Sequence, residues 1–109
     1  MSTATVNVTQ KNFEADILQS STPALIDFWA QWCAPCRAVA PVLDDLAEKF
    51  QGKFVVGKVN VDETPDLASK FGILNIPTMI FFKDGQEVDR VVGVQSKGQL
   101  EEKVQKLTG

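Results

Sequence analysis

The stretch ALIDFWAQWCAPC, residues 24–36, joins an apolar run to the two cysteines of the chain. Residues 24–30 are apolar on both faces apart from one carboxylate, which is typical of a buried strand. After the cysteines, apolar side chains recur at helical spacing, at Val39, Leu43, Leu46, Ala47 and Phe50. A strand, a Cys-x-x-Cys motif and a helix in that order indicate a redox site in a βα unit.

Cys33 stands where the helix is expected to begin. Unpaired backbone N–H groups and the positive end of the helix dipole favour a thiolate over a thiol at that point. We expect Trp32 and Pro35 to leave this sulfur partly exposed, as the nucleophile of disulfide exchange requires. The alternative, a buried structural thiol, is more typical of a lone cysteine in a core than of a pair at a helix start.

Cys36 follows about one helical turn later and should therefore face Cys33. A disulfide between the two would close a very small ring, so it would stabilise the fold only weakly through chain entropy. Such a bond is better suited to opening and closing than to holding the structure together. We predict that Cys36 is the more buried thiol and the one that resolves a mixed disulfide.

Asp27 lies in the middle of the apolar strand, a short distance before Cys33. Burial of a carboxylate raises its pKa toward neutrality, which suits a general base for a buried thiol. A solvent-facing position would require an alternating strand, and the flanking residues do not alternate. Lys58, on the next expected strand, is the candidate charge partner, with an ordinary exposed lysine as the alternative.

The remaining segments extend the βα unit into a complete α/β fold. Strands are expected at Thr5 to Val8, Ala24 to Ala30, Phe54 to Val61, Thr78 to Phe82 and Glu87 to Val92. Helices are expected from about Lys11 to Gln19, from the Cys-x-x-Cys motif to Phe50, from Thr64-Pro65 to Gly72, and from the capping box Ser96-Lys97-Gly98-Gln99 onward. The order βαβαβαββα predicts a mixed five-stranded β-sheet flanked by four α-helices, with the Asp84-Gly85 turn making the last two strands antiparallel.

The composition is that of an ordinary globular protein. The 109 residues, 44% apolar and 23% charged, suffice for a single domain over residues 1–109. A net charge of −3 without a Lys/Arg cluster argues against a nucleic-acid partner. No apolar run approaches the ~20 residues that span a membrane. Residues 1–7 do not resemble a signal peptide, so we expect a cytoplasmic protein, or a form that has already been processed.

The sequence contains no histidine. This absence excludes a Cys/His protease pair, a histidine proton relay and any zinc site that uses histidine. Two cysteines alone make a poor zinc site, which leaves a metal shared between two chains as the alternative. We therefore predict no metal and no cofactor, and any proton transfer near the thiols must use Asp, Glu, Lys or water.

Several further motifs follow one another along the chain, and with the Cys-x-x-Cys motif they resemble the thioredoxin family over essentially the whole sequence. They are Phe28-Trp29-Ala30, Trp32-Cys33-Ala34-Pro35-Cys36, Pro41, Lys58-Val59-Asn60-Val61-Asp62, Ile76-Pro77-Thr78, Lys83-Asp84-Gly85, Val92-Gly93 and Ser96-Lys97-Gly98-Gln99-Leu100. The resemblance implies the thioredoxin fold, with Pro77 in the cis form facing the thiols. It also implies a general protein-disulfide reductase, in which Cys33 attacks a target disulfide and Cys36 resolves the mixed disulfide, leaving a Cys33–Cys36 disulfide.

The resemblance implies roles for the surrounding residues as well. Asp27 would be the buried base, with Lys58 beside it. A flat apolar face would receive the backbone of the target, lined by Trp32, Ala34, Pro35, Ile76, Pro77, Val92 and Gly93. The expected partners are a thioredoxin reductase and many disulfide-containing target proteins. Nothing in the sequence requires a dimer, so we expect a monomer.

One residue departs from the family pattern, because Ala34 replaces the glycine that usually follows the first cysteine. Alanine stiffens the turn, so we expect a modest change in redox potential or partner choice without loss of activity. Two other functions stay open. A disulfide oxidant or isomerase is disfavoured by Pro35 and by the missing signal peptide. A non-catalytic binding module is disfavoured as the sole role by the intact dithiol and Asp27.

Overall fold

The computed structural model describes residues 4–109 as a layered α/β fold built on a five-stranded mixed sheet. In chain order the strands are β1 (Val6–Asn7), β2 (Ala24–Trp29), β3 (Val55–Asn60), β4 (Thr78–Lys83) and β5 (Gln86–Val92). The helices are η1 (Glu14–Leu18), α1 (Ala34–Lys49), α2 (Pro65–Lys70) and α3 (Lys97–Thr108). This succession confirms the predicted order βαβαβαββα.

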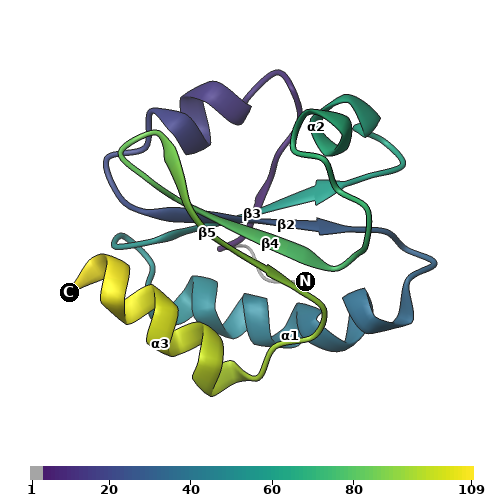
Figure 1. Cartoon of the computed structure of the whole chain (residues 1–109). Helices are drawn as coiled ribbons and strands as arrows, with labels where there is room; N and C mark the ends of the chain where they lie inside the picture. Colours follow the sequence, from purple (N-terminus) through teal and green to yellow (C-terminus); the bar gives the residue numbers. More distant parts are fainter. Residues whose placement is uncertain (1–3) are drawn as a thin grey trace.

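The sheet has the strand order β1-β3-β2-β4-β5. Strand β3 is parallel to both β1 and β2, whereas β4 is antiparallel to β2 and β5 is antiparallel to β4. In Figure 1, η1 and α2 cover one face of the sheet, and α1 and α3 cover the other. The strand that leads to the cysteines, β2, therefore lies at the centre of the sheet with helices on both sides.

The two faces of β2 bury different apolar clusters, which explains why its sequence does not alternate. Leu25 packs on one face with apolar side chains of α1 and α3, such as Leu43 and Leu100. Ile26 points to the other face and packs with residues near η1 and α2, such as Ile17. Successive strand residues point to opposite faces, so a strand with helices on both sides is apolar at every position.

The first helix differs from its prediction in length and type. Instead of an α-helix from about Lys11 to Gln19, the chain forms the short π-helical η1, in which the Gln19 N–H donates to the Glu14 carbonyl oxygen at 2.8 Å. A turn precedes it, closed by the Thr9 N–H donating to Asn12 Oδ1 at 2.7 Å. This turn occupies the residues that would have formed the first turn of the expected helix.

None of the helices within residues 4–109 is both long enough and apolar enough to cross a membrane.

Candidate redox site

The two cysteines lie at the start of α1 and form a disulfide, with their Cα atoms 5.3 Å apart. Cys33 is the N-cap residue of α1, and its sulfur accepts a hydrogen bond from the backbone N–H of Cys36 at 3.2 Å. Backbone N–H groups and the helix dipole both stabilise negative charge at this point. The same position would therefore favour the thiolate of Cys33 once the disulfide is reduced.

The cysteines are more buried than the sequence suggests. The exposed fraction is 5% for Cys33 and 2% for Cys36. The prediction that Cys33 is partly exposed is therefore wrong for this disulfide form, because Trp29, Val61 and Ile76 pack against the pair. Cys36 is the more buried of the two by a small margin.

The loop before β4 closes one side of the dithiol. The Ile76–Pro77 peptide bond is cis, and the Cys33 sulfur lies 3.8 Å from the carbonyl oxygen of Ile76. The Gly93 N–H donates to the Pro77 carbonyl oxygen at 2.8 Å, which ties the loop after β5 to the loop before β4. Two motifs that are remote from the cysteines in sequence are thus brought together beside them.

The seven residues expected to receive a target differ in how far they are exposed. Trp32 and Val92 are the prominent apolar side chains, with exposed fractions of 68% and 54%. Ala34 and Pro35 are also exposed, and Ile76 and Gly93 are half-buried. Pro77 is buried, so it shapes this face from beneath rather than forming its surface.

Trp32 has a partner that sequence reasoning missed. Its indole N–H donates to a carboxylate oxygen of Asp62 at 2.9 Å. The Asp62 N–H in turn donates to Asn60 Oδ1 at 2.9 Å, which fixes the loop after β3. Asp62 is separated from Trp32 by 30 positions, and no local pattern pairs a loop carboxylate with a distant indole. The hydrogen bond to Asp62 therefore holds the exposed indole ring of Trp32 in place.

Leu74 is a second residue that the sequence did not single out. Its side chain is 92% exposed, and it lies two positions before Ile76 in the loop that leads to β4. A single exposed leucine has no signal in a hydrophobic pattern, because exposed apolar residues occur on every protein surface.

Asp27 is fully buried in β2. It lies two positions from Leu25 and so faces α1, the helix that begins with the cysteines. Neither carboxylate oxygen accepts a hydrogen bond from any residue that the structure describes. Burial raises the pKa of Asp27 from 3.8 to about 7, and the positive charge of Lys58 opposes this rise. A carboxyl group with such a pKa can bind or release a proton near neutral pH.

Lys58 is buried beside Asp27 but does not form a close pair with it. The two residues are register partners in the parallel β2–β3 ladder, and Lys58 is 8% exposed. Its ammonium lies 5.2 Å from the centre of the Trp29 ring, within the range of a cation–π interaction. The charge of Lys58 therefore acts on Asp27 through space, not through a hydrogen bond.

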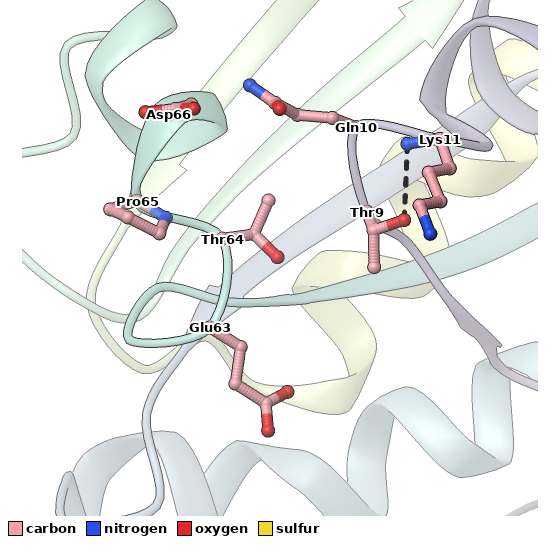
Figure 2. A pocket seen from close by; sticks show the side chains of 7 residues that line it. All are labelled: Thr9, Gln10, Lys11, Glu63, Thr64, Pro65 and Asp66. Carbon is pink, nitrogen blue, oxygen red and sulfur yellow. Dashed lines mark hydrogen bonds between the residues drawn. The ribbon is translucent and has the colours of Figure 1, made fainter.

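A separate hollow of about 310 Å³ lies between the turn after β1 and the start of α2, as Figure 2 shows. It is lined by Thr9, Gln10, Lys11, Glu63, Thr64, Pro65 and Asp66. None of these is an expected site residue, so this hollow is distinct from the redox site. In residues 4–109, no group of three or more His, Cys, Asp or Glu side chains is placed to hold a metal ion.

Comparison with known proteins agrees with this geometry. The family model described as Thioredoxin matches residues 4–106. The chain is 50% identical over 103 residues to Thioredoxin 1 of Nostoc sp., which covers 94% of this chain and 96% of the relative. It is 48% identical to Thioredoxin of Synechocystis sp. over 103 residues, with the same two shares of 94% and 96%. It is 49% identical to Thioredoxin of Pseudomonas aeruginosa over 100 residues, 92% of this chain and 93% of the relative.

Proposed function

The chain belongs to the thioredoxin family, and on that premise we propose how its residues carry out protein-disulfide reduction. Cys33 and Cys36 are the redox pair, and the protein has a disulfide reductase role. The observation that carries the proposed mechanism is the place of the Cys33 sulfur, which caps α1 and accepts the Cys36 N–H at 3.2 Å.

In the first step the thiolate of Cys33 attacks one sulfur of a target disulfide. A bond forms between the Cys33 sulfur and that sulfur while the S–S bond of the target breaks. The second target sulfur leaves with the bonding electron pair and takes up a proton. The N-cap position of Cys33 supports this step, because a thiolate is the attacking form and a helix N-terminus stabilises it.

In the second step Cys36 loses its proton and attacks the Cys33 sulfur. The bond between the Cys33 sulfur and the target breaks, and the released target sulfur takes the bonding electron pair and a proton. Both target sulfurs are then reduced, and Cys33 and Cys36 are oxidised to a disulfide. We assign the proton of Cys36 to Asp27. Its position on the α1 face of β2 and its raised pKa of about 7 support this role.

The partners follow from the same family membership. We propose that a thioredoxin reductase returns the Cys33–Cys36 disulfide to the dithiol, and that the targets are many proteins with accessible disulfides. The exposed side chains of Trp32 and Val92 beside the dithiol support a face that docks a polypeptide. We further propose a monomer of one domain that works in the cytoplasm, where thiols are kept reduced.

The mechanism is tested by reduction of insulin with dithiothreitol as the electron source. The Cys33→Ser variant should show no turnover, because the attacking sulfur is gone. The Cys36→Ser variant should accumulate mixed disulfides with insulin, detectable on a non-reducing gel, because the resolving sulfur is gone. Full activity of Cys33→Ser, in protein whose circular dichroism matches that of the parent, would refute the mechanism.

A further inference from the structure

Three side chains share the α1 face of the sheet beneath the dithiol. Asp27 and Trp29 lie two positions apart in β2 and therefore point to the same face. Lys58 is the register partner of Asp27 on β3, and its ammonium lies 5.2 Å from the centre of the Trp29 ring. Both carboxylate oxygens of Asp27 are buried without a hydrogen-bond partner in the described chain. The buried cation thus contacts the indole ring and not the neighbouring carboxylate.

The indole ring of Trp29 is fixed by packing. Trp29 packs against the cluster that contains Cys33 and Cys36, and its own Nε1 is buried without a hydrogen-bond partner among residues 4–109. Tryptophan offers the strongest cation–π surface of the aromatic side chains, and the interaction gains strength where water is excluded. Lys58 therefore has two competing positions, over the ring of Trp29 and next to the carboxylate of Asp27.

We propose that Trp29 is a positioning residue, whose ring holds the ammonium of Lys58 and thereby sets how strongly that charge acts on the Asp27 carboxylate. The inference rests on the proposed function, in which Asp27 accepts the proton of Cys36. When Asp27 ionises, the ammonium must leave the ring to reach the carboxylate, and loss of the cation–π contact opposes that movement. Trp29 thus raises the proton affinity of the Asp27 carboxylate, which makes it a better acceptor for the proton of Cys36.

Few other titratable groups face Asp27. The start of α1 presents Cys33 and Cys36, which do not titrate while they form the disulfide. On β4 the register partner of Asp27 is the uncharged Met79. The part of α3 that packs on this face of the sheet presents apolar side chains such as Leu100. In the oxidised protein, Lys58 is therefore the charge through which Trp29 can act.

The experiment is a titration of the Asp27 carboxyl carbon by NMR, in the oxidised full-length protein, for a double-mutant cycle. Trp29→Leu should lower the pKa of Asp27 by about one unit, because the ammonium is then free to move to the carboxylate. Lys58→Met should raise this pKa, because the opposing positive charge is removed. In the double variant, the pKa of Asp27 should equal that of Lys58→Met alone, because no ammonium is left for Trp29 to hold. Trp29→Phe keeps an aromatic ring, so the pKa of Asp27 in this variant should lie between its values in the parent and in Trp29→Leu.

Two outcomes would overturn the proposal. One is an unchanged pKa of Asp27 in both Trp29 variants. The other is a fall of equal size in the Lys58→Met background, which would mean that the ring acts only by excluding water. Trp29→Phe is the conservative variant, so it decides the question if Trp29→Leu does not fold.

The base assignment is judged separately, from the pH profile of mixed-disulfide resolution in the same variants. If the pKa of Asp27 shifts as expected while the midpoint of that profile stays in place, then Trp29 positions Lys58 but Asp27 is not the proton acceptor. If both shift together, the positioning role and the proposed function stand.

Discussion

At the scale of single residues, Asp27 combines complete burial with carboxylate oxygens that have no hydrogen-bond partner in residues 4–109. A buried charge without a partner is costly, so such a group favours its protonated form. The consequences reach both the stability of the fold and the rate of thiol exchange. Each can be measured without the other.

Asp27→Asn should stabilise the oxidised protein at pH 8 and have no stabilising effect near pH 4. The pKa of Asp27 is about 7 in the folded state and 3.8 in the unfolded state. At a pH between these two values, the folded state therefore binds a proton at Asp27 that the unfolded state has released. Stability contributed by Asp27 is present below the lower value and falls as the pH rises to about 7. A pKa raised from 3.8 to about 7 corresponds to about 4 kcal/mol, which is an upper estimate of the gain at pH 8. Urea unfolding at the two pH values measures it.

Asp89→Asn is the matched control for this stability test. The Asp89 pKa is lowered, chiefly by a hydrogen bond from Lys103, so its charged form favours the folded state. Stability from Asp89 is present above its ordinary pKa and is lost as the pH falls. This variant should therefore lose a little stability at pH 8. A gain of stability in both variants at pH 8 would point to the general effect of lower negative charge instead of the burial of Asp27.

Asp27→Asn should also slow disulfide exchange near neutral pH while leaving target binding nearly intact. The reason is that Cys36 would lose its proton acceptor, whereas the docking face is not altered. The rate of insulin reduction across about pH 6 to 9 covers the raised pKa of the Asp27 carboxyl group. An identical pH profile in parent and variant would remove the base assignment.

Part of the site is predictable from single residues, and part is not. The burial of Asp27 follows from the apolar, non-alternating residues around it. The contact of Lys58 with Trp29 and the hydrogen bond of Trp32 to Asp62 do not follow from any local pattern. They depend on how neighbouring strands and loops are placed. The burial of Cys33 was missed for the same reason, since it results from the packing of Ile76 and Val61.

At the scale of elements, the loops at one end of the sheet determine the shape of the site. The central unit of β2, the Cys-x-x-Cys motif and α1 is predictable, because a continuous apolar run and a helical repeat adjoin in sequence. The loops before β4 and after β5 meet only because β4 pairs with both β2 and β5. The Asp84-Gly85 turn predicts that β4 and β5 pair, but no local pattern places this hairpin beside β2 and the cysteines, and the family resemblance supplied that placement.

Gly93→Ala should destabilise the protein by about 1 kcal/mol, because Gly93 has a φ of +90° that side chains disfavour. No atom lies within 4 Å of an added Cβ, so backbone strain is the expected cause, not a clash. The measurement is urea unfolding. Gly98→Ala is the control in α3, where an added Cβ also meets open space, and it should be stabilising by roughly 0.5 to 1 kcal/mol. Equal effects of the two substitutions would contradict the role of strain.

At the scale of the whole molecule, the fold is more predictable than the site. The order of strands and helices follows from alternating apolar segments and turn signals, and the structure confirms it. The exception is η1, where the turn at Thr9 and Asn12 shortens the helix. The site, in contrast, collects residues from β2, β3, α1 and the loops before β4 and after β5. Its composition depends on the completed fold, which no single segment encodes.

The redox potential of the Cys33–Cys36 pair should be that of a reductant. We expect roughly −270 mV, which is the reference value for thioredoxins and not a value derived from this structure. Equilibration in thiol buffers measures it, with tryptophan fluorescence as the signal, since Trp29 packs against the pair. The Ala34→Gly variant isolates the modest effect expected of the alanine. A potential between roughly −120 and −180 mV would indicate an oxidant or isomerase instead.

The low exposure of Cys33, at 5%, also bears on which molecules can exchange electrons with this protein. A small free disulfide, such as that of glutathione, has no extended backbone with which to dock against Trp32 and Val92. A protein target brings that backbone with it, so recognition raises the local concentration of its disulfide at the sulfur. A target that docks on this face should therefore exchange with the dithiol faster than a small disulfide at the same concentration. The choice of partner would then depend on which proteins bind, and not only on their potentials.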